Sequence, residues 1–361
     1  MFAEARKTKT PRSPYSSSQV SHQHMITDSA PLSVNADAGP PCGDSDEQHI
    51  HWVSRAAFPL ISAAMILSQV ALGFAVFHGW YWLAVPLVLV TSHFMHGLLI
   101  GFHEASHGLL RKNKLLNEID GVLAGVLSFM SFTLYRAAHQ KHHMYLATER
   151  DEELWPFVNV DSPRWVRRLV AFIELNVGLA FTPFLFWRMF FRKNSFVRAR
   201  KVRRRIWGEF FLIIATWAAI LSAVAYFQVW SYFLWIFFAP GYIAGNLQSW
   251  RKYIEHVGLS GHTAKSATRS IIADTWSGRL LSLTLLHEPF HGVHHIKAGL
   301  PHTELPLHAN LLQPSIVGEV APFPNYRSAF KHLWAQLPDP RAGSHWPDKA
   351  ALPDSPTAST P

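Results

Sequence analysis

Long apolar segments alternate along the chain with polar stretches that are rich in histidine and arginine. Four of the apolar segments approach or reach the roughly 20 residues that a helix needs to cross a bilayer. They cover residues 56–77, 83–102, 206–227 and 229–247. Short links join the first segment to the second and the third to the fourth. The pattern therefore predicts two membrane-spanning helical hairpins.

The two ends of the chain lack this pattern. Residues 1–52 are rich in Ser, Pro, Ala and Gly without apolar periodicity, so we expect a disordered tail there. Residues 331–361 are expected to form a Pro-rich C-terminal tail. The folded membrane domain is therefore expected over residues 53–330.

The composition also favours a membrane protein. Of the 361 residues, 49% are hydrophobic and 16% are charged, whereas a soluble domain carries roughly 25% charged residues. The single cysteine, Cys42, excludes an internal disulfide framework, a cysteine-ligated zinc module and an iron–sulfur cluster. A bound metal must then be held by imidazole, carboxylate or water.

The net charge of +9 has a local source in the basic run of residues 191–205, between the two hairpins. Lysine and arginine beside membrane helices remain in the cytoplasm. The run lacks the aromatic platform or module that would indicate nucleic-acid binding. We therefore expect this loop in the cytoplasm, both hairpin tips on the far side, and no nucleic-acid partner.

Histidine is abundant, with 22 residues, and it forms three clusters: HEASH at 103–107, HQKHH at 139–143 and HGVHH at 291–295. Residues three or four apart are neighbours on a helix, so each cluster presents a compact set of imidazoles. Neutral imidazole binds iron, zinc and copper. Eight candidate ligands are too many for one ion, so two ions are predicted. The candidates are His103, His107, His139, His142, His143, His291, His294 and His295.

Other histidines lie near these clusters. His256 follows the last apolar segment on the same face and is a candidate ninth ligand, while His287 precedes His291 by four residues and is its rival. His93 and His96 lie deeper in the membrane, where hydrogen bonds between helices are expected.

Acidic side chains are expected to orient the imidazoles and to raise their basicity. Among them Glu255, beside His256, is the preferred candidate. The full set of candidate acids is Glu104, Glu149, Asp151, Glu152, Glu255 and Glu288.

Two interrupted apolar segments, 115–135 and 173–191, lie between the first hairpin and the basic run. A crossing by either segment would place the histidine clusters on opposite faces of the membrane. Both are therefore predicted to be interfacial or re-entrant.

The three clusters, in this order, resemble the histidine boxes of the integral-membrane fatty acid desaturases, a superfamily that includes membrane hydroxylases and carotenoid ketolases. The resemblance covers roughly residues 56–312 and extends to HHMYLATERDEELWPF and HHIKAGLPHTELPLHANLL after the second and third clusters. The segment YIEHVG resembles the fourth histidine motif of membrane alkane hydroxylases. Lys252 stands where that motif has asparagine, which argues against a straightforward alkane hydroxylase.

The resemblance implies an all-α integral membrane protein with a desaturase-like catalytic domain. Four transmembrane helices in two hairpins would carry a cytoplasmic helical cap that holds a His-rich di-metal site. Two non-haem irons would activate O₂ to oxidise an unactivated C–H bond, which side-chain acid–base chemistry cannot attack. Desaturation of a fatty acyl chain is the expected reaction, and hydroxylation or ketolation of a lipid or carotenoid is the alternative.

Electrons must then come from outside, because the chain has no GxGxxG motif, no haem-binding module and no cysteine cluster. A ferredoxin, rubredoxin or cytochrome b5-like carrier with its reductase is expected. Such carriers are often acidic, and the basic run could attract one. A bacterial inner membrane is the expected location, with an organellar membrane as the alternative.

Two other functions compete with an oxygenase. HEASH matches the HExxH motif of zinc proteases, with Glu104 as the general base. That interpretation leaves the second and third clusters unexplained. A metal transporter would place its ligands near the bilayer midplane, whereas these clusters follow the ends of apolar segments.

Overall fold

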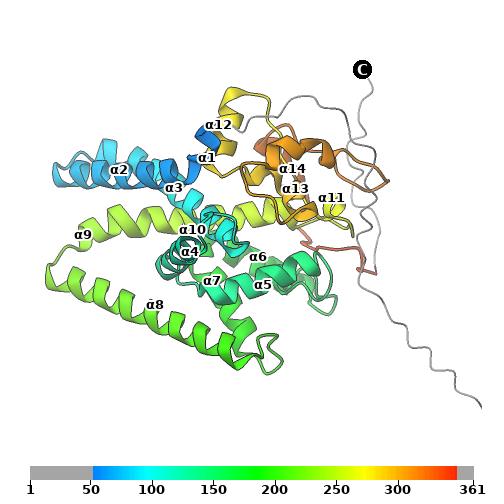
Figure 1. Ribbon diagram of the computed structural model, residues 1–361, viewed down its shortest axis with the longest axis horizontal. Helices are drawn as coiled ribbons and strands as arrows, with labels where there is room; N and C mark the ends of the chain where they lie inside the picture. Colours follow the sequence, from blue (N-terminus) through cyan, green and yellow to red (C-terminus); the bar gives the residue numbers. More distant parts are fainter. Residues whose placement is uncertain (1–51, 348–361) are drawn as a thin grey trace, which may run out of the picture. The chain divides into compact units, whose positions relative to one another are not determined.

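The long helices of the protein coincide with the apolar segments of the sequence. The computed structural model describes residues 52–347, and over this range the chain is helical and forms no β-strand (Figure 1). The first half contains α1 (Trp52–Arg55), α2 (Ala57–Phe77), α3 (Tyr81–Ser106), α4 (Lys114–Leu127), α5 (Phe132–Met144), the 3₁₀ turn η1 (Glu152–Leu154), α6 (Arg164–Asn176) and α7 (Gly178–Phe191). The second half contains α8 (Arg200–Tyr226), α9 (Trp230–Tyr232), the π-helical η2 (Phe233–Phe238), α10 (Ala239–His256), α11 (Ala264–Ala267), α12 (Trp276–Thr284), the 3₁₀ turn η3 (Glu288–Phe290), α13 (His291–Ile296), the 3₁₀ segment η4 (Leu305–Leu312) and α14 (Tyr326–Gln336).

Three helices, α2, α3 and α8, are long and apolar enough to cross a membrane. Many of their apolar side chains lie on the outer surface, such as Leu67 on α2 (69% exposed) and Phe211 on α8 (73% exposed). In water this surface would be unfavourable, whereas in a bilayer it faces lipid. These features identify a membrane protein.

The fourth predicted span, 229–247, overlaps a continuous helical run from Trp230 to His256 that comprises α9, the π-helical η2 and α10. The second half of α10 is polar and carries Gln248, Arg251, Lys252 and Glu255. By length and apolar composition, the described residues contain three candidate spans, or four if the bent pair of α4 and α5 counts as one.

Neither of the two interrupted apolar segments forms a straight span. Within 115–135 the chain breaks between α4 and α5, which meet at an angle of 101°, and Phe129 in this break has a φ of 60°. Within 173–191 the chain breaks at Val177, between α6 and α7.

Close packing of α7 against α10 brings the interrupted segment to the polar half of α10. A Cβ atom on Gly178 would lie 2.6 Å from the carbonyl oxygen of Gly245, so the backbones touch without side chains between them. One turn away, Glu174 forms an ion pair with Lys252 and accepts a hydrogen bond from the hydroxyl of Tyr253 at 3.0 Å. Lys252, which replaces asparagine in the fourth motif, therefore has a partner on α6.

The C-terminal region differs from the prediction. The boundary expected after residue 330 falls inside α14, and the chain remains packed against the domain as far as Trp346, which is 9% exposed. Leu333 and Ala342 are fully buried because apolar residues of this segment complete the core. The tail predicted for residues 1–52 lies outside the described residues except for Trp52, which begins α1.

Candidate metal centre

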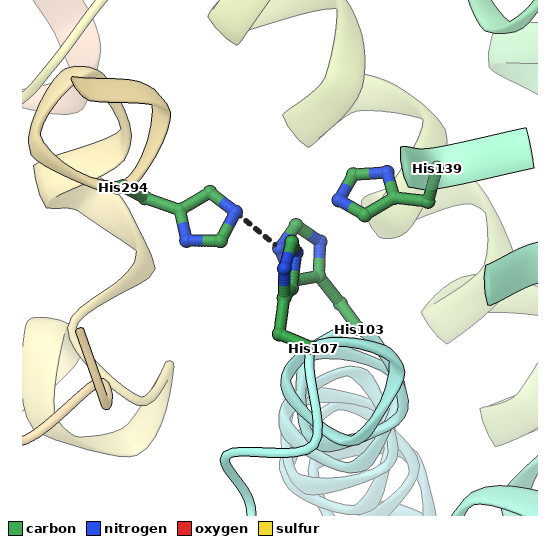
Figure 2. A group of neighbouring side chains, drawn as sticks. All are labelled: His103, His107, His139 and His294. Carbon is green, nitrogen blue, oxygen red and sulfur yellow. Dashed lines mark hydrogen bonds between the residues drawn. The ribbon is translucent and has the colours of Figure 1, made fainter. Parts of the chain in front are cut away.

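Nine histidines from four helices converge on one region, at the ends of the helices that carry them. The helical spacing of each cluster turns its imidazoles to a common side, as Figure 2 shows for His103, His107, His139 and His294. The nine residues comprise His103 and His107 of the first cluster, on and just after α3, His139, His142 and His143 on α5, His256 on α10, and His291, His294 and His295 on α13.

The first histidine group consists of His103, His107, His139, His143 and His294. Four of them place one ring nitrogen each within 4.8 Å of all the others, and His143 lies beside them. The Nε2 atoms of His103 and His294 are 2.9 Å apart. The Nε2 atom of His143 lies 3.1 Å from those of His139 and of His294.

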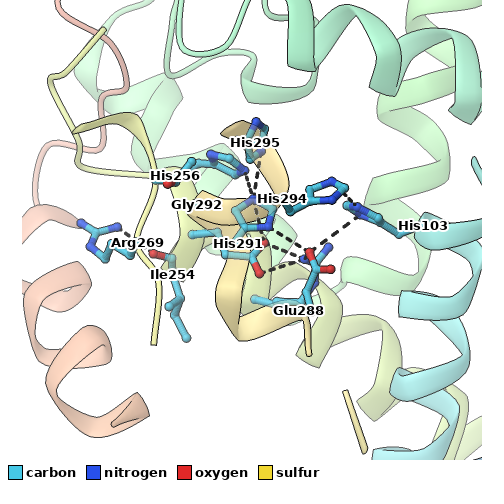
Figure 3. Close-up of polar contacts among 12 residues, drawn as sticks. His103, Ile254, His256, Arg269, Glu288, His291, Gly292, His294 and His295 are labelled. Carbon is cyan, nitrogen blue, oxygen red and sulfur yellow. Dashed lines mark hydrogen bonds and ion pairs between the residues drawn. The ribbon is translucent and has the colours of Figure 1, made fainter. Parts of the chain in front are cut away.

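The second histidine group consists of His142, His256, His291 and His295, with Glu255 beside it. The Nε2 atoms of His291 and His256 are 2.8 Å apart, and those of His295 and His291 are 3.1 Å apart (Figure 3). A ring nitrogen of His142 lies within 4.8 Å of nitrogens of His256 and His295. A carboxylate oxygen of Glu255 likewise lies within 4.8 Å of nitrogens of His256 and His291.

These nitrogen–nitrogen distances fit metal coordination. A neutral imidazole has one N–H, so clustered Nε2 atoms cannot all be satisfied by hydrogen bonds to one another. Two nitrogens bound at about 2.1 Å and at right angles to one ion lie about 3 Å apart. The observed 2.8–3.1 Å separations match that geometry in both groups.

The opposite nitrogen, Nδ1, of several imidazoles has an acceptor. A hydrogen bond from Nδ1 fixes the tautomer and turns the Nε2 lone pair toward the centre. The pairs are His142 with Asp151 (2.8 Å), His139 with Glu153 (3.0 Å), His291 with Glu288 (2.9 Å) and His256 with the carbonyl of Ala267 (3.3 Å).

Burial favours the neutral form of most of these imidazoles, whereas for His142 the carboxylate of Asp151 outweighs burial and raises the pKa above 6.5. Burial lowers the pKa of His294 and of His295 well below the usual range, and it also lowers the pKa of His291. Neighbouring imidazoles lower these pKa values further, because a second positive charge nearby is unfavourable. Neutral imidazole is the form that binds a metal ion.

Comparison with known proteins identifies the family of the chain. The model of the family described as fatty acid desaturase matches residues 80–327, more than half of the chain. The chain belongs to the fatty acid desaturase family. It is also similar to a protein named fatty acid desaturase from Bacillus subtilis (strain 168), with 23% identity over 240 residues, 62% of this chain and 67% of that protein. The predicted resemblance is confirmed, and the desaturase-family match contains all nine histidines.

His287, predicted as a possible ligand, does not join either group. Its Nε2 atom lies 3.2 Å from the hydroxyl of Ser54 and its Nδ1 atom lies 3.1 Å from the hydroxyl of Ser282. The prediction assumed a continuous helix from residue 287 to His291. The backbone instead has a φ of 55° at His287 and then forms the turn η3, so the two imidazoles do not share a helical face. His256 takes the ninth position.

Glu255, the preferred candidate for an acid that orients an imidazole, does not lie where that role requires. It lies on the Nε2 side of His291, with its Oε2 atom 3.6 Å from that nitrogen, rather than behind an imidazole. The buried Arg251 binds it at 2.7 Å and also pairs with Glu288. Sequence reasoning missed Arg251, although its position four residues before Glu255 could have indicated an ion pair.

The acids behind the second cluster come from one loop, and the sequence identified only one of them. Asp151 was among the candidates, but Glu153 was missed in favour of its neighbour Glu152. Glu152 pairs instead with Arg192, and Glu149 is exposed. Burial raises the pKa of Glu153 to about 7.

The first cluster does not have the arrangement of a zinc protease. Glu104 is buried and accepts a hydrogen bond from the backbone N–H of His302 at 2.8 Å. The histidines on either side of it share their group with His139 and His294. Deeper in the membrane, His93 lies 2.8 Å from the hydroxyl of Thr284, which confirms the predicted hydrogen bond between helices for that residue.

Two cavities lie along the helices that carry the centre. A cavity of about 50 Å³ is lined by ligands of both groups, including His103 and His256. An apolar cavity of about 310 Å³ lies between the membrane helices, lined by residues such as Leu99, Trp217 and Ala244. Leu99 and Ala244 lie about one turn before His103 on α3 and Gln248 on α10, which line the smaller cavity. The two cavities therefore follow one another along the same helices.

Proposed function

We propose that the protein desaturates the acyl chain of a membrane lipid with two non-haem irons, O₂ and electrons from a separate carrier. The observation that carries this proposal is the pair of histidine groups, together with an apolar cavity between the membrane helices whose lining residue Leu99 lies about one turn before His103 on α3. The first group would hold one iron and the second group the other. When bound, the irons would supply the oxidant for an unactivated C–H bond.

The proposed reaction balances with the components named. An acyl –CH₂–CH₂– unit, O₂, two electrons and two protons give –CH=CH– and two water molecules. Two of the four electrons that reduce O₂ come from the acyl chain and two come from the carrier. The protein's own residues hold the ligands, exclude water from the buried centre and orient the chain in the cavity.

The apolar cavity fits an unbranched acyl chain better than a polar substrate, since its walls are aliphatic and aromatic side chains. Gly241 lines it, and a Cβ atom there would meet only the Cε atom of Met95, at 3.8 Å. Gly241→Leu should therefore fold and fill part of the cavity, so that the longest acyl chains lose reactivity before shorter ones. Gly208→Leu, at an exposed helical position with open space around it, is the matched control.

The dependence of the reduction rate on salt concentration tests where the electron carrier binds. Lys193, Arg198 and Lys201 are exposed on the predicted cytoplasmic run, where an acidic ferredoxin, rubredoxin or cytochrome b5-like protein could bind. The reduction rate should then fall as the salt concentration rises. A rate independent of salt contradicts this docking site. The proposal places the centre on the cytoplasmic side, in a bacterial inner membrane.

The function is tested by expressing the wild type and His142→Ala with suitable redox partners and profiling lipids by mass spectrometry. The proposal predicts acyl chains with two hydrogens fewer in the wild type alone. A product with one oxygen more would instead show hydroxylation, and loss of two hydrogens with gain of one oxygen would show ketolation. Unchanged lipids in cells whose protein contains iron would contradict action on acyl chains.

A further inference from the structure

The segment after α14 lies outside the residues that the family model matches, yet it packs closely on the domain. We call residues 338–346 the C-terminal strap. Ala342 within it is fully buried and Trp346 is 9% exposed, although the family match ends at residue 327. The strap thus lies beyond the family match and still contacts the interior of the domain.

One side of the strap binds the loop that follows the second histidine cluster. The backbone N–H of Ala342 and the indole N–H of Trp346 both donate to the carbonyl of Phe157, at 2.9 and 3.2 Å. The imidazole of His345 lies 2.7 Å from the carbonyl of Val158. This loop carries the acids that bind imidazoles of the second cluster.

The other side of the strap binds the turn directly after His256. The backbone N–H of Gly258 donates to the carbonyl of Arg341 at 2.7 Å. The backbone N–H of Gly343 donates to the carbonyl of Leu259 at 2.8 Å. The strap therefore joins two segments that are far apart in sequence. One holds Asp151 behind His142 of the second histidine group and Glu153 behind His139 of the first, and the other directly follows His256 of the second group.

Gly343 lies at the tightest point between these segments. Its φ is +92°, and a Cβ atom there would lie 1.9 Å from the carbonyl oxygen of Ala147. The N–H of Ala147 donates to Asp151 at 3.0 Å, and the same carboxylate oxygen binds His142 at 2.8 Å. A larger residue at position 343 would displace Ala147, and with it the backbone N–H that binds Asp151, the partner of His142.

Arg167 on α6 binds the strap through hydrogen bonds and a contact with an aromatic ring. Its buried guanidinium donates to the carbonyl of Pro340 at 3.0 Å and also binds Asp339 and the carbonyl of Ser162. The same group lies 4.5 Å from the ring of Trp346. The adjacent Arg168 is exposed.

We propose that the C-terminal strap is a positioning element for the second histidine group. It holds the Asp151–His142 pair against His256 and so sets the affinity of this group for its ion. The first histidine group should respond less, because the tightest contact of the strap joins Gly343 to Ala147, whose N–H binds the Asp151 that holds His142. Glu153, behind His139 of the first group, is reached through the backbone of the same loop. This inference rests on the proposed two-ion centre.

The test compares two glycine substitutions in the full chain. Gly343→Ala introduces the clash, whereas Gly318→Ala places the same side chain at the same φ of +92° with nothing within 4 Å. Metal-free protein in detergent is titrated with Co²⁺, a spectroscopic substitute for iron, and each binding step is followed by absorbance. This measurement does not depend on desaturation.

The expected result is two binding steps in the wild type and in Gly318→Ala. Gly343→Ala should weaken one step by about 10–100-fold, the cost typical of losing support behind a ligand, and change the other by less than about threefold. His256→Ala, which disables the second group, should bind one ion with equal affinity with or without Gly343→Ala. A wild type that binds fewer than two ions would contradict the proposed centre itself, and the inference with it.

Two results would overturn the inference while leaving the proposed function intact. One is equal binding by Gly343→Ala and Gly318→Ala, and the other is equal weakening of both steps by Gly343→Ala. If Gly343→Ala does not fold, the same titration is carried out on Arg167→Ala, which removes contacts to the strap without adding bulk. Arg168→Ala is its control. Arg167→Ala should weaken the same single step, and unchanged or uniformly weakened binding would count against the strap.

Discussion

The two histidine groups use the same kind of ligand but are supported in different ways. The second group has hydrogen-bond acceptors behind three of its four imidazoles, supplied by loops and turns. In the first group, the Nε2 atom of His107 and the Nδ1 atom of His294 are buried without a hydrogen-bond partner among the described residues. The first group has one close carboxylate behind an imidazole, with Glu153 at 3.0 Å from the Nδ1 atom of His139. The first group therefore relies less than the second on contacts from elsewhere in the chain.

This difference predicts unequal responses of the two groups to changes outside the histidines. Helical spacing turns His103 and His107 to one side of α3, and His139 and His143 to one side of α5. Outer carboxylates raise ligand basicity and fix orientation, so the second group should respond more strongly to changes outside the histidines.

The largest expected effect is the loss of a ligand. His291→Ala should reduce product formation by more than about 100-fold, beyond the cost of losing an outer partner, because the second group would lose one of its four imidazoles. His287→Ala, four residues earlier, should retain most of the activity. Lipid profiling of both variants checks this, and equal losses would contradict the separation of His287 from the centre.

A smaller effect is expected from the acids behind the ligands. Asp151→Asn keeps the shape of the side chain but removes the charge behind His142, and should weaken binding at the second group by about 10–100-fold. Glu149→Gln alters an exposed acid of the same loop and should have no effect. Metal titration of both variants measures the difference. Equal weakening at the first group would contradict the difference in support between the two histidine groups.

The smallest effect concerns the support of α10 and its pH dependence. Arg269 donates to the carbonyls of Ile254 and Val257 at 2.9 and 2.8 Å, and its Nε–H donates to His332. Burial and the charge of Arg269 lower the pKa of His332 from 6.5 to about 4, and the ring of Phe323 also packs against it. Between these pH values the unfolded chain binds a proton that the folded chain does not, so stability should fall as the pH falls.

His332→Gln tests this pH effect because glutamine can accept the hydrogen bond without titrating. The thermal unfolding midpoint of the variant should fall less between pH 7 and pH 5 than that of the wild type. Equal changes in the two proteins would contradict a role of His332 in this window.

Much of the centre could be predicted from the sequence because its ligands lie on helices. The spacing of the three clusters placed eight histidines, and the position of His256 after an apolar segment added the ninth. The apolar segments likewise predicted α2, α3 and α8 to within a few residues at most of their ends.

The remainder depends on breaks in regular structure, which spacing does not reveal. The positive φ at His287 removed it from the helical face that its sequence position implied. The choice between Glu152 and Glu153 depends on the 3₁₀ turn η1, which buries Glu153 behind His139. The C-terminal strap escaped prediction because its contacts come mainly from backbone groups, and a Pro-rich composition suggested a tail.

The proposed centre holds two irons with nine histidines in two separate groups. The metal content of the purified full chain tests it, expressed with ample iron and measured by inductively coupled plasma mass spectrometry against protein concentration. We expect about two irons per chain and no stoichiometric zinc. One zinc per chain, or a maximum of one iron in the fully loaded wild type, would contradict it.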